Sequence, residues 1–358
     1  MKKILSIIGV LVLMMALTAC GSPTEEQPEE QIDYEIAMVT DSRMIMDGGY
    51  SEEAWNAVSE FGAENGISHK YYKASEASDE AYSAAIENAV SNGAKVIVAD
   101  GYSFEHVVYH AQEKYPDVKF ILIDAEPVDK ESGETKLAEN TMTVMFSSQQ
   151  AGYLAGYSAV KEGMSELGFF GSAEQSAIMD YGYGFLQGAE DANEGSNSEV
   201  NIRFHCCDED DDRDDVLAKS TDWYEDGTQM IFACGAYIEQ PVIEAAELTG
   251  EYVIGYETDK TGMSDTVIAS AVKDISTAIK SALELYSSDK FPGGEVLYYN
   301  AENKGLWLTM DDEKFENFSE SDYEDIYEMI ADGSIEIEGY DGENIDDLEF
   351  DNIDIDVE

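Results

Sequence analysis

Metal chemistry is the first possibility that the sequence raises, through the acidic run Asp208–Asp215 (DEDDDRDD). Closely spaced carboxylates are the ligands of calcium loops. Counted from Asp208, however, the sixth residue is Arg213, where an EF-hand needs glycine, and the twelfth is Lys219, where it needs glutamate. We therefore predict a solvated loop at this run.

The cysteines and histidines also lack the spacing of a metal site. Three cysteines follow Cys20 without a CxxC pair: Cys206, Cys207 and Cys234. This odd set supports neither a zinc site nor a disulfide framework. Adjacent residues of a strand face opposite ways, so Cys206 and Cys207 are predicted to be small packed side chains. His106 and His110 share a face of a predicted helix but have no third ligand. No metal and no cofactor is predicted.

Motifs of covalent and phosphoryl-transfer catalysis are missing from the sequence. It contains no Gly-x-Ser-x-Gly nucleophile elbow and no phosphate loop. The first predicted strand, Glu35–Val39, leads into Thr40-Asp41, not into an aspartate cluster of the Asp-x-Asp-x-x-x-Asp-Asp type. We predict that the chain is not an enzyme. Asp41 is a candidate binding residue, because a carboxylate at the end of a strand accepts hydrogen bonds from a ligand or caps a turn.

The elements that must position such residues begin at Tyr34, where short apolar runs alternate with amphipathic stretches. Strands are predicted at Glu35–Val39, Ile67–Tyr72, Lys95–Ala99 and Phe120–Asp124. Helices are predicted between them at Ser51–Glu64, Asp79–Ser91 and Phe104–Lys114. Asn65-Gly66 and Asn92-Gly93 are typical helix ends. This order predicts βαβ units and a parallel sheet.

A second series of the same kind follows. Its predicted helices are Gln149–Val160, Ser176–Asn193, Val216–Tyr224 and Pro241–Leu248, and its predicted strands are Leu167–Phe170, Val200–His205, Met230–Ala233 and Tyr252–Tyr256. A helix at Ile275–Tyr286 and strands near Glu295–Tyr299 and Leu306–Met310 come after both series. The chain is therefore predicted to cross between two α/β lobes more than once. We assign residues 34–140 and 268–296 to lobe 1, and residues 141–267 and 297–358 to lobe 2. Such folds bind ligands in a cleft at the carboxyl ends of the strands.

The N-terminal segment is typical of an exported, lipid-anchored protein. Lys2 and Lys3 precede the apolar run Ile4–Leu17, which is shorter than the roughly 20 residues of a membrane span. The run ends at Leu17-Thr18-Ala19-Cys20, which resembles the bacterial lipobox, whose cysteine is acylated. We predict a lipoprotein signal peptide over residues 1–19, a lipidated Cys20, and an acidic tether over residues 20–33. The protein is then expected on the extracytoplasmic face of the cell membrane, held there by its lipid anchor.

The charge balance excludes one class of partner. The 358 residues include 77 acidic and 20 basic side chains, for a formal net charge of −57. Nucleic acids bind clusters of lysine and arginine, so no nucleic-acid partner is predicted. The same field disfavours ligands that carry phosphates relative to neutral or cationic small molecules.

Several motifs occur in a fixed order along the chain: Thr40-Asp41 followed by Ile45, Asp47, Ala54 and Trp55; Tyr115–Phe120 leading to Asp124; Ala151–Gly156; Gly184-Phe185; Ile254–Asp259; and Ser270–Lys273. In order and spacing they resemble the basic membrane proteins, or purine nucleoside receptor lipoproteins, which are substrate-binding components of ABC transporters. The resemblance covers nearly the whole chain after the tether. It implies an α/β, two-lobed, type I periplasmic-binding-protein-like fold, in which each lobe is a parallel sheet flanked by helices. It also implies a small-molecule ligand, most simply a purine nucleoside, and ABC permease subunits as partners.

The resemblance further implies which residues hold the base of a nucleoside. Tyr50 and Tyr181 fall where the family has stacking aromatic residues, one from each lobe. Asp41 falls where a carboxylate accepts hydrogen bonds from purine N–H groups. The full predicted set of ligand-binding residues is Asp41, Tyr50, Ser51, Gly101, Tyr102, Asp124, Tyr181, Gly235, Glu257, Asp259 and Lys273.

The resemblance also implies which residues contact the ribose. Asp124, Glu257 and Lys273 fall on family positions that resemble ribose contacts, and carboxylates with an ammonium group suit vicinal hydroxyls because they supply strong acceptors and a donor. Gly101-Tyr102 matches a family Gly-Phe pair, where the backbone can approach a ligand closely.

Three positions depart from the family pattern. Ser51 stands where the family has a base-reading asparagine, Ala236 and Tyr237 add side chains beside Gly235 where the family has a Gly-Gly pair, and Glu257-Thr258-Asp259 extends the family's Asp-x-Asp by one methylene. Three functions therefore stay open. The first is a purine nucleoside receptor of an ABC importer. The second is a receptor for a sugar or a signal molecule, or a surface adhesin, on the same fold. The third is a nucleoside-processing enzyme.

Overall fold

The computed structural model describes residues 33–42, 45, 48–172, 176–196, 198–207, 211–310, 313–342 and 344–358. The predicted signal peptide, Cys20, Asp47 and the first three residues of the acidic run at 208–210 lie outside these ranges. Within them, no helix combines the length and the apolar character that crossing a membrane requires.

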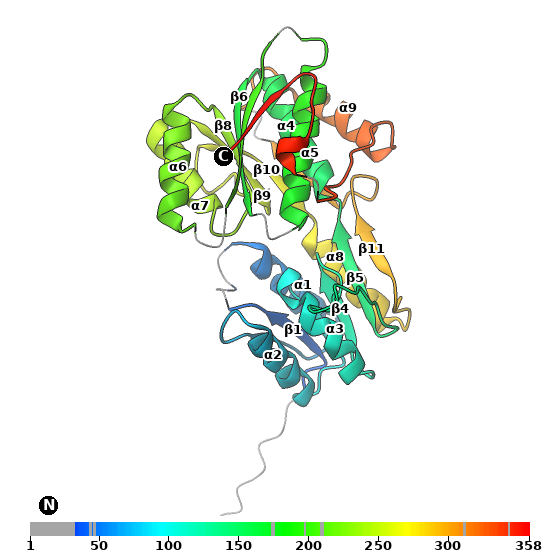
Figure 1. The fold of residues 1–358 in the computed structure, drawn as a ribbon. Helices are drawn as coiled ribbons and strands as arrows, with labels where there is room; N and C mark the ends of the chain where they lie inside the picture. Colours follow the sequence, from blue (N-terminus) through cyan, green and yellow to red (C-terminus); the bar gives the residue numbers. More distant parts are fainter. Residues whose placement is uncertain are drawn as a thin grey trace, which may run out of the picture. The chain divides into compact units, whose positions relative to one another are not determined.

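Six parallel strands form the first sheet (Figure 1). In spatial order they are β11 (Val296–Tyr299), β5 (Thr141–Phe146), β4 (Lys119–Ile123), β3 (Val96–Ala99), β1 (Ile36–Thr40) and β2 (His69–Lys73). One face packs against helices α1 (Tyr50–Asn65) and α8 (Ile275–Ser287), and the other against α2 (Asp79–Ser91) and α3 (Glu105–Lys114). Because both faces are covered, β1, β3 and most of β4 are buried along their length, as expected of central parallel strands.

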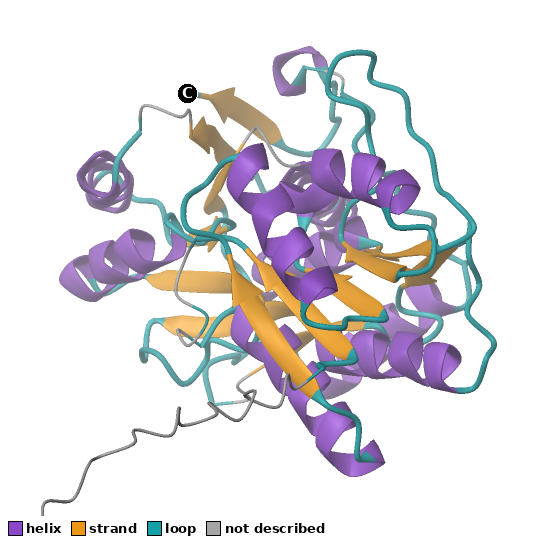
Figure 2. Ribbon diagram, turned by 90° about the horizontal axis from the view of Figure 1, so that it is seen from below, coloured by secondary structure: helices purple, strands orange, loops and turns teal. Residues whose placement is uncertain are grey.

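Seven strands form the second sheet. In spatial order they are β12 (Leu306–Met310), β10 (Val267–Lys273), β9 (Tyr252–Glu257), β8 (Met230–Ala233), β6 (Glu166–Ser172), β7 (Asn201–Cys207) and β13 (Asp354–Val357). Only β12, at one edge, runs antiparallel to its neighbour. Helices α4 (Ser148–Glu162), α5 (Ser176–Asn193) and α9 (Glu320–Ala331) pack on one face, and α6 (Arg213–Glu225) and α7 (Glu239–Thr249) on the other (Figure 1). Figure 2 shows strands lying between layers of helices. Two short 3₁₀ turns lie at Tyr102–Phe104 and Ile345–Asp347.

The predicted two-lobed α/β fold with helix-flanked parallel sheets is confirmed, but the boundaries between the lobes need correction. The chain passes between the sheets three times, after β5, after β10 and after β11. Strand β5 belongs to the first sheet, where Thr141 pairs with Phe120, although residue 141 was predicted to start the second lobe. Strand β10 belongs to the second sheet, beside β9, although residues from 268 were assigned to the first lobe. Strand β11 continues in the first sheet to Tyr299, beyond the predicted boundary at 296.

The backbones of α4 and α5 touch, and glycines make this possible. A Cβ atom added to Gly152 would lie 2.0 Å from the Tyr181 carbonyl oxygen, and one added to Gly156 would lie 2.1 Å from that of Phe185. On the facing helix, a Cβ atom on Gly184 would lie 1.9 Å from the Gln149 carbonyl oxygen. No side chain fits at such distances. The motifs Ala151–Gly156 and Gly184-Phe185 therefore serve helix packing and lie away from any ligand.

Candidate functional site

A cavity of about 580 Å³ is bordered by loops that follow strands of both sheets. This volume is in the range of small-molecule sites. The first sheet and its helices contribute Gly49, Tyr50, Ser51, Asp100, Gly101, Tyr102, Ser103, Glu105, Asp124, Ala125, Glu126, Val128, Thr135 and Met145. The second sheet and its helices contribute Ala177, Ala236, Glu239, Gln240, Tyr256, Glu257, Thr258, Lys260 and Met263.

A buried charge cluster forms the base of the cavity. The Lys273 side chain, at the end of β10, is fully buried, and its Nζ lies 2.7 Å from Asp124 Oδ2 and 3.8 Å from Glu257 Oε1. Burial alone would lower the pKa of Lys273, but the charges of Asp124 and Glu257 more than offset this effect and raise it above its ordinary value. Lys273 therefore stays protonated and ties a carboxylate from the first sheet to one from the second.

Both carboxylate residues adopt an uncommon backbone conformation. Asp124 follows β4 with φ of 54°, and Glu257 ends β9 with φ of 61°. The left-handed region is costly for residues other than glycine, and such strain gathers at functional sites. The Asp124 side chain is 8% exposed, and among the described residues its Oδ1 has no hydrogen-bond partner, while Oδ2 is held by Lys273. Asp124 thus presents a buried acceptor at the cavity wall.

Tyr50, the first residue of α1, contributes an aromatic ring to the same wall. Its hydroxyl is buried and finds no hydrogen-bond partner among the described residues. Burial, followed by the charges of Asp124 and Asp100, raises the pKa of Tyr50, so the hydroxyl stays neutral and able to donate. Nearby, the Ser51 hydroxyl donates to Asp100 Oδ2 at 2.6 Å, and the Thr40 hydroxyl donates to the same oxygen at 2.9 Å. These bonds fix Asp100 in the cavity wall.

The second-sheet side of the cavity carries another buried ion pair. Glu239, the first residue of α7, is 6% exposed, and its Oε2 lies 3.5 Å from Lys260 Nζ. Burial raises the pKa of Glu239 to about 7, although Lys260 and the Tyr256 amide, which donates to Oε1, both lower it. Lys260 Nζ also donates to the Gly48 carbonyl oxygen at 3.3 Å, which links the second half of the chain to the loop before α1.

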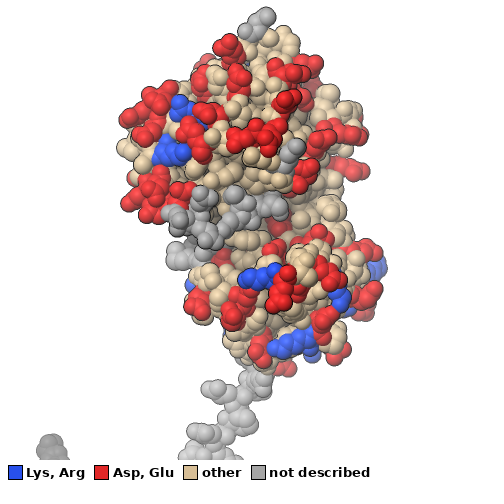
Figure 3. All heavy atoms as spheres, in the orientation of Figure 1, with Lys and Arg blue, Asp and Glu red and all other residues tan. Residues whose placement is uncertain are grey.

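Carboxylates dominate the electrostatics of this cavity. Six line it: Asp100, Glu105, Asp124, Glu126, Glu239 and Glu257. Among the residues that the structure describes, Lys260 alone brings a positive charge to the lining, and Lys273 lies behind the wall. The visible outer surface has the same balance, with many acidic side chains and few basic ones (Figure 3). Such a cavity suits a ligand that offers hydrogen-bond donors and carries no phosphate.

Comparison with known proteins identifies the family. Residues 34–339 match the family model described as ABC transporter substrate-binding protein, PnrA-like, also called Bmp. The chain belongs to the Bmp family. The ABC transporter nucleoside-binding protein BmpA of Lactococcus lactis subsp. cremoris (strain MG1363) is 23% identical over 336 residues, covering 87% of this chain and 92% of that protein. Basic membrane protein D of Borreliella burgdorferi (strain JD1) is 25% identical over 315 residues, covering 86% and 87%.

A solved structure supports the fold of this Bmp family member. The crystal structure of ABC transporter system solute-binding proteins from Aeropyrum pernix K1 superimposes with a TM-score of 0.74 at 16% identity, covering 87% of this chain and 95% of that one. The chain is thus a substrate-binding protein of the ABC transporter type. Proteins of this class act outside the cytoplasm, bind a small molecule and deliver it to a permease.

Six of the residues predicted from the Bmp resemblance line the cavity: Tyr50, Ser51, Gly101, Tyr102, Asp124 and Glu257. Gly101 has φ of 87°, which only glycine adopts readily, while a Cβ atom there would meet nothing within 4 Å. The requirement at this position is therefore conformational. Tyr102 is 38% exposed, so much of its side chain is accessible. Lys273 lies behind the wall and positions Asp124 and Glu257.

Four other predicted residues do not line the cavity. Tyr181 was expected to stack on the ligand, but it is fully buried, its hydroxyl donates to the Ala271 carbonyl oxygen at 3.4 Å, and its ring packs edge-on against Tyr256. It supports the cavity wall from behind. Asp41 is buried at the end of β1, outside the lining set. Gly235 packs against Ile238.

Asp259 is the fourth predicted residue that does not line the cavity. It is exposed and accepts hydrogen bonds from the Thr261 amide and hydroxyl, as in a capped turn. Its neighbours Thr258 and Lys260 line the cavity instead. Of the two departures beside Gly235, Ala236 adds its side chain to the lining and Tyr237 does not.

Sequence reasoning missed five charged residues of the site: Asp100, Glu105, Glu126, Glu239 and Lys260. A signal existed for Asp100, because it follows β3 directly, as Asp41 follows β1 and Asp124 follows β4. Glu239 and Lys260 carry no such local signal. Each occupies the cavity wall because α7 and the loop after β9 face one another in the fold.

Proposed function

We propose that this protein captures a purine nucleoside in the cavity and delivers it to an ABC permease. Its family accounts for the transport role, and the BmpA relative is named as a nucleoside-binding protein. The observation that carries the choice of ligand is the buried Oδ1 of Asp124, which has no hydrogen-bond partner among the described residues and lies in a cavity wall rich in acceptors. Ribose hydroxyls and the N–H groups of a base are neutral donors that satisfy such acceptors without bringing in negative charge.

The placement of the nucleoside follows from the lining residues. Asp124 and Glu257 would accept from the ribose hydroxyls, with Lys273 holding both carboxylates in place. The Tyr50 ring would stack on the base, and Tyr102 offers a second, partly exposed aromatic face. Tyr181 takes no direct part in this arrangement, because it lies behind the wall.

Calorimetry with the purified protein would test the ligand class. Adenosine, guanosine and inosine are compared with their 5′-monophosphates and with free ribose. Repulsion from the cavity carboxylates should make a nucleoside bind roughly a hundredfold more tightly than its monophosphate. Equal affinity for the two would refute the proposal, and binding of ribose alone would favour the sugar-receptor alternative.

One substitution separates the proposed contact from general charge effects. Asp124→Asn keeps the shape of the side chain and tolerates the left-handed backbone, since asparagine adopts positive φ with little cost. Loss of a charge-assisted bond worth about 1.5–3 kcal/mol should weaken nucleoside binding at least roughly tenfold. Asp259→Asn, at an exposed position outside the cavity, is the matched control and should bind as the wild type does.

We further propose that Cys20 anchors the protein through a lipid. The support is the Leu17-Thr18-Ala19-Cys20 sequence alone. The wild-type protein should partition with membranes and carry acyl chains on its N-terminal residue by mass spectrometry, and Cys20→Ala should release it or block its processing. A soluble wild-type protein with an unmodified N-terminus would contradict the anchor.

A further inference from the structure

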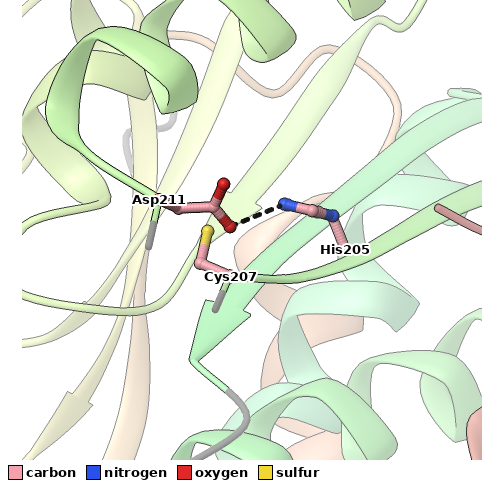
Figure 4. Close-up of side chains that lie close together, drawn as sticks. All are labelled: His205, Cys207 and Asp211. Atoms are coloured by element: carbon pink, nitrogen blue, oxygen red, sulfur yellow. Dashed lines mark ion pairs between the residues drawn. The ribbon is translucent and has the colours of Figure 1, made fainter. Parts of the chain in front are cut away.

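Three side chains with metal-binding atoms meet at the carboxyl end of β7: His205, Cys207 and Asp211 (Figure 4). One ligand atom from each lies within 4.8 Å of those of the other two. His205 Nε2 and Asp211 Oδ2 are 3.6 Å apart. The sequence spacing gave no sign of this group, because its members are a histidine, a cysteine and a carboxylate instead of a CxxC pair.

The fold brings these side chains together for simple reasons. His205 and Cys207 are two residues apart in β7, so they project from the same face of the sheet, while Cys206 between them contacts Met179 on the other face. Asp211 immediately precedes Asp212, which caps the N-terminus of α6 in a capping box with Asp215. Strand β7 thus positions His205 and Cys207, and the cap of α6 positions Asp211.

The histidine is oriented as metal-binding histidines are. Its Nδ1 hydrogen-bonds to the main-chain oxygen of Glu358, and its ring packs edge-on against Phe170 and, farther away, Trp223. When Nδ1 donates to an oxygen, Nε2 carries the free lone pair, and this outer contact both selects the tautomer and fixes the ring. In this protein the lone pair is then directed towards Asp211 and Cys207 (Figure 4).

The separations fit a tetrahedral ion. Zinc binds nitrogen and oxygen at about 2.0–2.1 Å and sulfur at about 2.3 Å, which places N and O ligands about 3.3 Å apart and S about 3.6 Å from either. The observed N to O distance is 3.6 Å, and the sulfur lies within 4.8 Å of both. The three side chains therefore need to move by about 1 Å at most to coordinate a zinc ion.

The site is separate from the ligand cavity, and two of its three ligands reach a solvent-open hollow, while Cys207 is buried beneath them. His205 and Asp211 line a second hollow of about 540 Å³ that shares no lining residue with the first. The two cations that line it are already paired, Arg203 with Asp226 at 3.6 Å and Lys219 with Glu358 at 3.4 Å. Because their charges are already balanced, the negative potential of the acidic chain can attract a divalent cation to this hollow.

We propose that His205, Cys207 and Asp211 bind Zn²⁺, with water as the fourth ligand. A sulfur, nitrogen and oxygen donor set in tetrahedral spacing selects zinc over calcium and magnesium, which prefer six or more oxygen ligands. Binding forms a Zn–S bond at Cys207 and releases the thiol proton to solvent. The ion would fasten the end of β7 to the start of α6.

Cobalt substitution tests the proposal against non-specific binding to surface carboxylates. The full-length protein is titrated with Co²⁺, and a thiolate–Co²⁺ bond gives a charge-transfer absorption that carboxylates do not give. The wild type should show this band, and Zn²⁺ should abolish it by displacement. Cys207→Ser should remove the band, and Asp211→Asn should weaken Zn²⁺ binding at least roughly 100-fold, beyond the loss typical of an outer-shell contact.

Two matched variants serve as controls. Cys206→Ser changes the thiol on the opposite face of β7, and Asp214→Asn removes an exposed carboxylate of the same acidic run. Both should keep the band and the affinity of the wild type. Absence of the band in the wild type, its persistence in Cys207→Ser, or its equal loss in Cys206→Ser would overturn the proposal.

A measurement on the unaltered protein guards against a variant that fails to fold. Alkylation of each cysteine is followed by peptide mass spectrometry with and without Zn²⁺. Zn²⁺ should slow modification of Cys207 at least tenfold and leave that of Cys206 unchanged. Equal alkylation rates of Cys207 in both conditions would also refute the site.

Discussion

Replacing Glu239 with glutamine should change how folding stability depends on pH. Glu239 is 6% exposed, and burial raises its pKa from 4.5 to about 7. A carboxyl group whose pKa is higher in the folded chain than in the unfolded chain holds its proton more tightly when folded. Its contribution to stability is therefore complete below pH 4.5 and is lost as the pH rises through 7. At about 1.4 kcal/mol per pKa unit, the shift corresponds to about 3 kcal/mol of unfolding free energy.

Urea unfolding of the wild type and of Glu239→Gln between about pH 4.5 and pH 8 would measure this. Glutamine keeps an oxygen that accepts from the Tyr256 amide, so the variant should gain about 3 kcal/mol relative to the wild type across that range. Glu247→Gln, at an exposed position on the same helix, is the matched control. A difference between wild type and Glu239→Gln that stays constant with pH, or that Glu247→Gln reproduces, would refute the reasoning.

Three further predictions concern the cavity and the helices beside it. Lys273→Met leaves the buried Asp124 and the partly exposed Glu257 uncompensated, so urea unfolding should show a loss of about 3–5 kcal/mol, and a loss below about 1 kcal/mol would contradict the charge cluster. Gly156→Ala drives a Cβ atom against the Phe185 carbonyl and should cost more than about 3 kcal/mol, whereas Gly262→Ala, with open space around it, should cost little; similar losses in both would exclude the helix contact as the cause. Ligand contacts from both halves of the chain predict hinge closure, so the radius of gyration from X-ray scattering should fall at saturating nucleoside, and an unchanged value would argue against closure.

Periodicity predicted most of the fold. The helices Asp79–Ser91 and Ser176–Asn193 and the strands Met230–Ala233 and Leu306–Met310 have the predicted bounds, because each is a strongly patterned segment between clear end signals. It was harder to predict which sheet each strand joins. The partner of a strand is chosen by packing between distant segments, so no local pattern could tell that β5 pairs with β4. Strands β5 and β10, which lie between the two predicted series and after the second, were not predicted at all. Helix α9 and strand β13 were also missed, since their acidic surroundings hide a short apolar stripe.

The site was predictable to the extent that position along a strand decides it. Asp124 directly follows β4 and Tyr50 begins the helix that comes after β1, and both line the cavity. Tyr181 and Asp259 failed because motif position does not tell whether a side chain faces a cavity, the core or solvent. Asp259, which is exposed, and Lys260, which lines the cavity, are adjacent in the sequence.

The three crossings between the sheets impose an order on how the protein is made. The first sheet is incomplete until α8 covers the face that α1 lies on and β11 pairs with β5. At about 5–20 residues per second, synthesis needs roughly 8–30 s to extend from Phe146 to Tyr299. During that interval the face of the first sheet that α1 and α8 share has no complete cover. This part of the first sheet therefore cannot reach its final structure until the later segments have been made.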